Sequence, residues 1–274
     1  MILSPPASVT QTTAATALLV ASAVAVGAYL LLALTRWPDS RARALMAAGW
    51  LAHGVALFID IGGVGLDQPA TRFGFAPALS ATLWLVIAVY LIESRLLPLA
   101  GARRVLCGLG VVIVALAAAF QGAPHPTVSP WAPLHWLLGL ASYGLFGAAV
   151  LHALLLNRAE RQLRLKTKAP QGEAMPLLQL ERLTFQFVAA GVIVLSAAIV
   201  LGWSITAQWR WDHKTLLSLL GWFVLTGLLV GRRVFGWRGR LATRWLYVGA
   251  VLLLLAYAGS RFVFEVILHR PPVA

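Results

Sequence analysis

Charged residues are scarce in this chain. They make up 11% of its 274 residues, and only 9 side chains are acidic. Soluble domains are usually about one quarter charged, whereas here 60% of the residues are hydrophobic and the mean hydropathy is +0.82. A core of this size does not hide so much apolar surface from water, so lipid must be the solvent. The composition excludes a soluble protein and predicts a polytopic membrane protein.

Cysteine is nearly absent as well. The only one, Cys107, excludes both a disulfide framework and a Cys-x-x-Cys redox pair. The sequence also lacks a P-loop, a dinucleotide-binding glycine fingerprint, an HExxH zinc motif and a repeat of about 20–50 residues. Without a self-contained catalytic constellation, the chain is not predicted to be an enzyme.

Long apolar stretches account for most of the chain. Eight of them lie at about residues 13–35, 44–66, 77–97, 104–120, 131–156, 183–203, 214–231 and 242–268. Each is close to the roughly 20 residues that cross a bilayer as a helix. No basic residue precedes the first stretch and no small-residue cleavage pattern follows it, so we expect a retained helix rather than a signal peptide. The prediction is one all-α integral membrane domain over residues 1–274, a bundle of eight transmembrane helices.

Basic residues are distributed unevenly between the loops. The first, third, fifth and seventh loops, counted with the adjoining span ends, hold 3, 3, 6 and 5 Lys or Arg, which is 17 of the 22 in the chain. By the positive-inside rule these loops are predicted to be cytoplasmic, so the expected topology is N-out and C-out. Topology therefore explains the net charge of +13. The lipid bilayer is a predicted partner, and nucleic acid is not.

Histidines gather near the outer face in this topology. Four of the six fall there, namely His125, His135, His213 and His269. A neutral imidazole presents one lone pair to iron, and two facing imidazoles hold a haem from both axial sides. Haem also has an apolar ring and charged propionates, which suits the edge of a bilayer. These residues predict a haem site at the outer face.

The segment QWRWDHKTLLSLLGW, residues 208–222, supplies the other parts of such a site. Aromatic side chains would shelter the ring, and cations would meet the propionates. The residues with these two roles are Trp209 and Trp211 for the ring, and Arg210 and Lys214 for the propionates. Asp212 and His213 are supporting candidates, and Asp212 would hold the loop by accepting hydrogen bonds from backbone amides or by pairing with Arg210.

Other interpretations of these polar and aromatic residues stay open. Tryptophans form interfacial belts without any ligand, and His152 is expected to reach the inner surface as a solvated side chain. His53 lies near mid-membrane, where polar groups are costly and tend to be functional, so it is a supporting or second-site candidate. Arg261 and Glu265 are four residues apart and would pair, either to pin the bundle or as part of the site.

Two segments carry a resemblance to a known family. QWRWDHKTLLSLLGW resembles the "WWD" segment of the haem-handling membrane proteins of cytochrome c assembly, the CcsA/ResC/CcmC group, and most closely their smaller YpjD- or HemX-like members. PWAPLHWLLGLASYG, residues 130–144, is similar to the segment that opens a helix of these proteins with a histidine. The resemblance covers about residues 75–270. It implies that His135 and His269 are the axial ligands of the haem iron.

The resemblance also implies a function. We expect the chain to bind or handle haem b at the outer face of a bacterial inner membrane in support of cytochrome c biogenesis, with other assembly proteins or apocytochrome as partners. One alternative is a non-haem scaffold or regulator of the HemX-like kind, acting through the cytoplasmic residues 157–182. Another is a small-molecule transporter, although the sequence has no inverted repeat.

Overall fold

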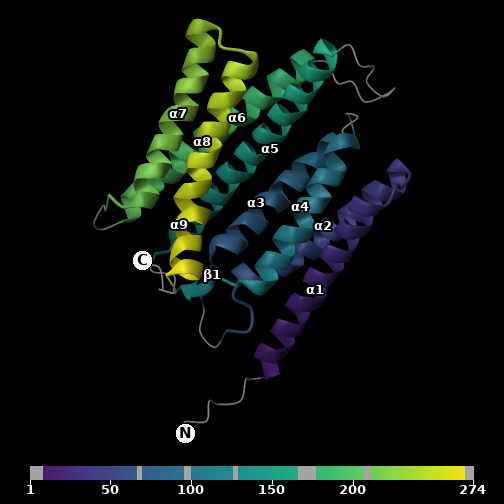
Figure 1. Cartoon of the computed structure of the whole chain (residues 1–274). Coiled ribbons are helices and arrows are strands. Elements are labelled where there is room, and N and C mark those ends of the chain that lie inside the picture. Colours follow the sequence, from purple (N-terminus) through teal and green to yellow (C-terminus); the bar gives the residue numbers. More distant parts are fainter. Residues whose placement is uncertain are drawn as a thin grey trace.

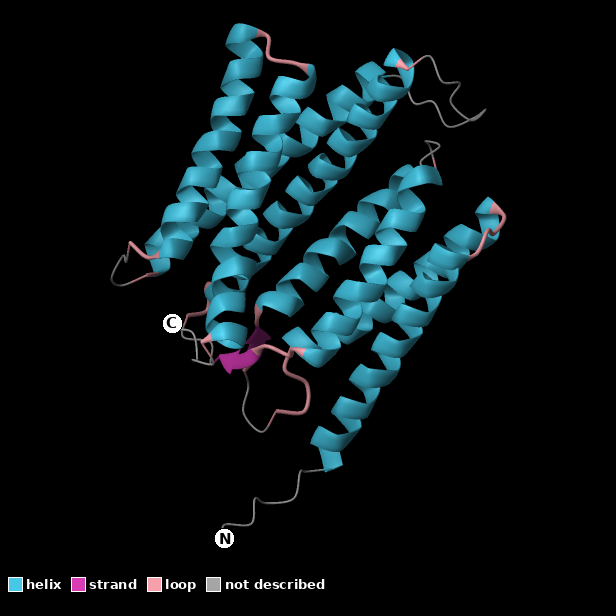
Figure 2. Cartoon of the chain, in the orientation of Figure 1, coloured by secondary structure: helices cyan, strands magenta, loops and turns pink. Residues whose placement is uncertain are grey.

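A computed structural model presents the chain as a bundle of long antiparallel helices (Figures 1 and 2). The structure describes residues 9–66, 70–95, 100–125, 129–165, 177–206 and 211–268. Within these ranges, eight helices are long and apolar enough to span a membrane. Helices suit this solvent because each one satisfies its own backbone hydrogen bonds where no water is available. The predicted all-α polytopic fold is confirmed.

The predicted spans are recovered with shifted ends. The helices are α1 (Val9–Leu34), α2 (Asp39–Ile61), α3 (Phe75–Glu93), α4 (Ala100–Ala119), α5 (Ala132–Arg164), α6 (Leu177–Ile205), α7 (His213–Phe235) and α8 (Gly239–Leu254). Helix α2 ends earlier than predicted because a turn follows in which Gly63 has a φ of 61°. Helix α5 ends later, since the strong helix formers of NRAERQLR extend it to Arg164.

The last helix changes from α-helical to largely π-helical hydrogen bonding near its end. After α8 the chain continues as a π-helix, η1 (Leu255–Gly259), a short α9 (Ser260–Phe262) and a second π-helix, η2 (Val263–Ile267). Segments with i→i+5 hydrogen bonds are rare and are found frequently at functional sites. Here they place Tyr257 and Arg261 on the lining of the pocket described below.

Two short strands occupy segments that the sequence predicted to be loops. Strand β1 (Thr71–Phe73) pairs antiparallel with β2 (Ala123–His125), with Thr71 opposite His125 and Phe73 opposite Ala123. The approach is close, because a Cβ at Gly122 would lie 2.5 Å from the carbonyl carbon of Phe73. The ladder therefore ties the segment before α3 to the segment after α4.

The two ends of the bundle differ in charge. The helix ends that flank the α1–α2, α3–α4, α5–α6 and α7–α8 connections lie together at one end, which we call the basic end (Figure 1). The predicted basic loops, counted with the adjoining span ends, belong to this end and carry 17 of the 22 Lys and Arg residues of the sequence. The strands, the end of α6, the start of α7, the start of α1 and the end of η2 lie at the opposite end, the strand end (Figure 1). The predicted alternation of the loops thus agrees with the fold, and the positive-inside rule predicts that the strand end faces outside.

Helices α1–α4 and α5–α8 form two groups that meet mainly through α3 and α5. Small residues allow close approach, as in other membrane bundles. Gly191 of α6 leaves room for the Phe146 ring of α5, and Gly249 of α8 leaves room for Leu225 of α7. Contacts of α7 and α8 with the remaining helices are fewer than those between α5 and α6. The pocket described below lies where α7 and the end of the last helix meet α3, α5 and α6.

Several polar side chains inside the bundle have partners on neighbouring helices. Trp50 of α2 and Trp84 of α3 stack with their ring centroids 4.6 Å apart, and each indole Nε1 donates to the other residue's backbone carbonyl. His152 is fully buried, with its Nε2 atom 2.9 Å from a carboxylate oxygen of Glu93. The expectation that His152 is solvated at the inner surface is therefore wrong. Glu93 at the end of α3 supplies the polar partner that water would otherwise provide.

Candidate functional site

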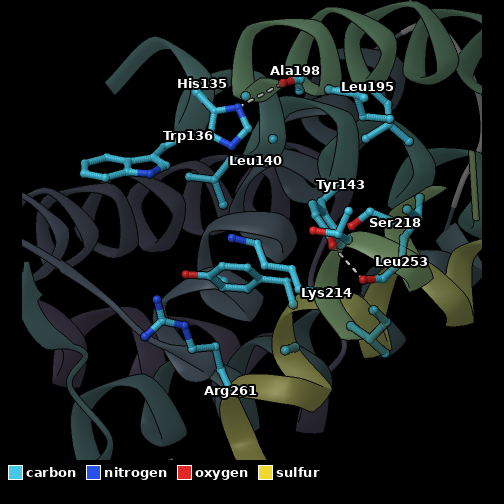
Figure 3. Close-up of a pocket in the computed structure, with 18 of the residues that line it drawn as sticks. His135, Trp136, Leu140, Tyr143, Leu195, Ala198, Lys214, Ser218, Leu253 and Arg261 are labelled. Atoms are coloured by element: carbon cyan, nitrogen blue, oxygen red, sulfur yellow. Dashed lines mark hydrogen bonds between the residues drawn. The ribbon is translucent and has the colours of Figure 1, made fainter. Parts of the chain in front are cut away.

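A pocket of about 620 Å³ opens between α3, α5, α6, α7 and the η1–α9 segment. Its volume is within the range of about 300–1,000 Å³ that is usual for small-molecule and cofactor sites. Most of the lining is apolar or aromatic, with a few polar groups that converge on it: His135, Tyr143, Asp212, Lys214, Tyr257 and Arg261. Figure 3 shows several of these side chains facing a common space.

The hydrogen bonding of His135 determines which ring nitrogen is available. Its Nδ1 atom lies 2.9 Å from the backbone carbonyl oxygen of Ala198 in α6. A carbonyl oxygen only accepts, so Nδ1 carries the proton and donates it. The Nε2 atom then keeps its lone pair, which is the form of histidine that binds metal. Gly202 of α6 leaves the space that the His135 ring occupies. A Cβ at position 202 would lie 2.7 Å from Cε1 of His135.

Aromatic side chains form much of the wall beside His135. Trp136 follows it in α5 and packs against Phe73 of β1, with ring centroids 5.2 Å apart. On the other side, the Tyr143 hydroxyl donates to the Leu253 carbonyl over 2.6 Å and so links α5 to α8. Flat apolar ligands favour such surroundings.

Cations converge on one aromatic ring of the pocket. The Lys214 ammonium lies 5.7 Å from the centroid of the Tyr257 ring, and the Arg261 guanidinium lies 5.8 Å from it. The Arg261 guanidinium is also 3.6 Å from the Glu265 carboxylate. The predicted Arg261–Glu265 pair is therefore confirmed, and its arginine faces the pocket.

The segment from 211 to 215 begins α7. Asp212 is the N-cap residue, and its Oδ1 atom accepts from the backbone amide of Thr215 over 2.8 Å. This hydrogen bond fits the predicted loop-holding role of Asp212. Trp211 is 67% exposed and His213 is also exposed, and neither belongs to the pocket lining. Trp209, Arg210 and His269 lie outside the described residues.

His53 does not line this pocket. It is fully buried, with its Nε2 atom 2.8 Å from the Ser80 hydroxyl and its Nδ1 atom 3.3 Å from the Tyr29 hydroxyl. Both ring nitrogens thus have hydroxyl partners from neighbouring helices. The pocket therefore brings together His135, Lys214 and Asp212 of the predicted residues, and it leaves His53 in the core of the α1–α4 group.

Sequence reasoning did not single out two tyrosines of the pocket, Tyr143 and Tyr257. Tyr143 lies two turns after His135 on α5, and this helical spacing is the signal that was available. Tyr257 precedes Arg261 by four residues, so the two share a helix face. The sequence does not indicate which helix face points into the cavity, because this depends on packing between helices that are distant in the sequence.

Together, the eight helices long and apolar enough to span a membrane and the pocket toward the strand end define a polytopic membrane protein with a pocket in its bundle. The sequence model of the cytochrome c assembly protein family matches residues 12–268. The chain belongs to this family, and this membership supports a role in cytochrome c biogenesis. No solved structure matches the chain.

Similar proteins have been described in several bacteria. An uncharacterised 28.8 kDa protein of Azospirillum brasilense is 32% identical over 74% of this chain and 80% of its own length. The inner membrane protein YpjD of Escherichia coli is 36% identical over 52% of this chain and 56% of its own length. The cytochrome c biogenesis protein CcsA of Gloeobacter violaceus is 30% identical over 31% of this chain and 27% of its own length. With the eight spans, these relatives confirm the prediction of a multi-pass inner membrane protein.

Proposed function

We propose that the chain binds or handles haem at the outer face of the inner membrane in support of cytochrome c assembly. The observation that carries this proposal is the state of His135. Its Nδ1 proton is donated to the Ala198 carbonyl, so Nε2 is available in an apolar pocket of about 620 Å³. Family membership points to the same chemistry from the sequence side.

Haem fits the residues that line the pocket. When bound, the haem iron accepts nitrogen lone pairs along its axis and supplies the redox chemistry of a cytochrome. His135 would provide one axial ligand, and His269 is the proposed second ligand on the resemblance alone. Lys214, which lines the pocket, would meet a propionate. Sequence reasoning alone gives Trp209 and Trp211 the role of sheltering the ring and Arg210 that of meeting the other propionate, because Trp211 does not line the pocket and residues 209 and 210 lie outside the described ranges. Haem b is the expected form, because the chain has only Cys107 and this thiol is buried away from the pocket.

The chain would act as an assembly factor rather than as an enzyme. Its proposed partners are haem, other cytochrome c assembly proteins and the apocytochrome. Attachment of haem to an apocytochrome needs thiols, and these would come from the apocytochrome. The role of this chain would be to hold haem in one orientation at the membrane surface, with His135 kept in a single tautomer by α6.

The test is an absorption spectrum of the purified full-length chain, oxidised and then reduced with dithionite, after expression with a haem precursor. A Soret band with sharp reduced α and β bands is expected, as for six-coordinate haem. The paired changes His135→Ala and His269→Ala should remove most of the bound haem. His213→Ala is the matched control, because His213 is exposed and outside the pocket, and it should retain the haem.

A folded, monodisperse and colourless protein would contradict the proposal. The same conclusion would follow if the paired histidine changes left the haem content unaltered. In either case the scaffold alternative would take its place, with residues 157–182 as the segment to test in pull-down experiments. Residues 166–176 of that segment lie outside the described ranges.

A further inference from the structure

We propose that Lys214 and Arg261 form a two-cation site that selects ligands carrying two carboxylates, independently of the metal that His135 would bind. This inference rests on the proposed function and deepens it. The two cations come from different helices, Lys214 from α7 and Arg261 from α9. Both lie close to the Tyr257 ring, at 5.7 and 5.8 Å from its centroid. Arg261 was not among the residues predicted to meet propionates.

The pocket lining carries more positive than negative charge. Its two cations, Lys214 and Arg261, face one carboxylate, Asp212, whose Oδ1 atom accepts from the Thr215 amide at the start of α7. Among the described residues, no carboxylate lies within 4.0 Å of the Lys214 ammonium, which lies over the Tyr257 ring. The wall of the pocket therefore has a net positive charge.

Glu265 compensates Arg261 only in part. One of its carboxylate oxygens lies 3.6 Å from the Arg261 guanidinium, and the other accepts from the Phe75 amide over 3.3 Å. Glu265 thereby connects the end of the last helix to the start of α3. It does not belong to the pocket lining, whereas Arg261 does. Glu265 therefore orients Arg261 toward the pocket and leaves part of the guanidinium available to a ligand.

The position of these cations relative to His135 suits an amphipathic ligand. Figure 3 shows Lys214 and Arg261 on one side of the space and His135 on the other, with Leu140 between them. The Arg261 side chain is only 18% exposed, where a cation without full compensation is costly, and two ligand carboxylates on one edge would meet both Arg261 and Lys214. A porphyrin with two propionates has this chemistry with or without iron.

The test compares haem with its dimethyl ester, which keeps the iron and the ring but has no carboxylate. Each would be titrated into the full-length chain in a non-ionic detergent, so that no anionic lipid headgroup competes. The wild-type chain should bind haem at least about tenfold more tightly than the ester. Iron-free protoporphyrin should likewise bind more tightly than its own dimethyl ester.

Variants then show which residues cause the preference for free carboxylates. Lys214→Gln and Arg261→Gln should each weaken haem binding by roughly tenfold while leaving ester binding nearly unchanged, so that the preference for free carboxylates shrinks. Arg244→Gln is the matched control, since this arginine is exposed in the second turn of α8 and lies outside the pocket. It removes the same charge and should keep the full preference.

The outcomes separate this inference from the proposed function. Equal binding of haem and ester by the wild-type chain would overturn the two-cation site and leave haem binding intact. Binding of neither compound would contradict both proposals. If Arg261→Gln does not fold, as judged by gel filtration, then Lys214→Gln and the wild-type ester comparison decide the question. An undiminished preference in Lys214→Gln would count against the site.

Discussion

The imidazole of His135 is held in one orientation by two contacts from α6. The Ala198 carbonyl accepts its Nδ1 proton, and Gly202 leaves space for the ring one turn further along. A residue with a side chain at position 202 would occupy the volume of Cε1, since the Cβ would approach it to 2.7 Å. At the scale of single residues, the availability of Nε2 therefore depends on a glycine that makes no polar contact itself.

Gly202→Ala should displace the His135 ring and weaken haem binding. Forcing an extra methyl group into a packed site usually costs about 1–3 kcal/mol, and here that strain would fall on the ligand side chain. The measurement is a haem titration followed by its Soret band. Gly139→Ala is the matched control, because Gly139 also lines the pocket but a Cβ there would meet nothing within 4 Å. Equal loss of affinity in both variants would refute the proposed role of Gly202.

Pairs of helices are joined by specific side chains. Trp50 and Trp84 link α2 to α3 through two reciprocal hydrogen bonds of 3.0 and 2.9 Å and through ring stacking. The residue Gly54 allows this, because its missing side chain leaves room for the Trp84 indole. Hydrogen bonds between helices in a membrane are individually modest, so a pair that also stacks is a distinct point of attachment. At the scale of elements, this contact positions α3, which forms one wall of the pocket.

Trp84→Phe should lower the stability of the folded chain without altering the haem site. It removes the donor to the Trp50 carbonyl and the fit of the stacked rings, for an expected loss of about 1–2 kcal/mol. Thermal unfolding of the purified chain in detergent, monitored by circular dichroism, measures the change. Trp203→Phe is the control, since Trp203 is exposed on α6 and should tolerate the substitution. A variant as stable as the control would show that the reciprocal bonds contribute little.

The whole molecule separates a basic end from a strand end that carries the pocket. The positive-inside rule predicts that the basic end is cytoplasmic, and the pocket would then open on the outer side. This orientation rests on the 17 basic residues in and beside the four predicted loops, whose flanking helix ends lie at one end of the bundle (Figure 1). At this scale the prediction concerns which end faces the cell exterior.

Cysteine labelling tests the orientation. The only cysteine, Cys107, is fully buried, so a Cys107→Ser chain provides a clean background. In intact spheroplasts, a membrane-impermeant maleimide should label His213→Cys at the strand end and should not label Arg240→Cys at the basic end. Both positions are exposed, so lysis should make both reactive. Labelling of Arg240→Cys alone before lysis would invert the topology and place the pocket on the cytoplasmic side.

Hydropathy and charge along the sequence were sufficient to predict the membrane class, the eight spans and their alternation. These properties depend on the solvent around each segment, and each segment of about 20 apolar residues responds to lipid largely by itself. Local chemistry was also readable, as the capping hydrogen bond of Asp212 and the spacing of Arg261 and Glu265 illustrate. Both contacts join residues within four positions of each other.

Only the tertiary structure decided which polar residues meet. His135 and Ala198 are 63 positions apart, Lys214 and Tyr257 belong to different helices, and Glu93 covers His152 from another helix. The short strands and the position of His53 outside the pocket are also products of packing. In lipid the helix faces are largely apolar, so hydropathy does not indicate which face turns inward; small residues and paired polar groups select it. The sequence by itself therefore determined the spans and their polarity, whereas interhelical packing determined the pocket and which nitrogen of His135 remains available on its lining.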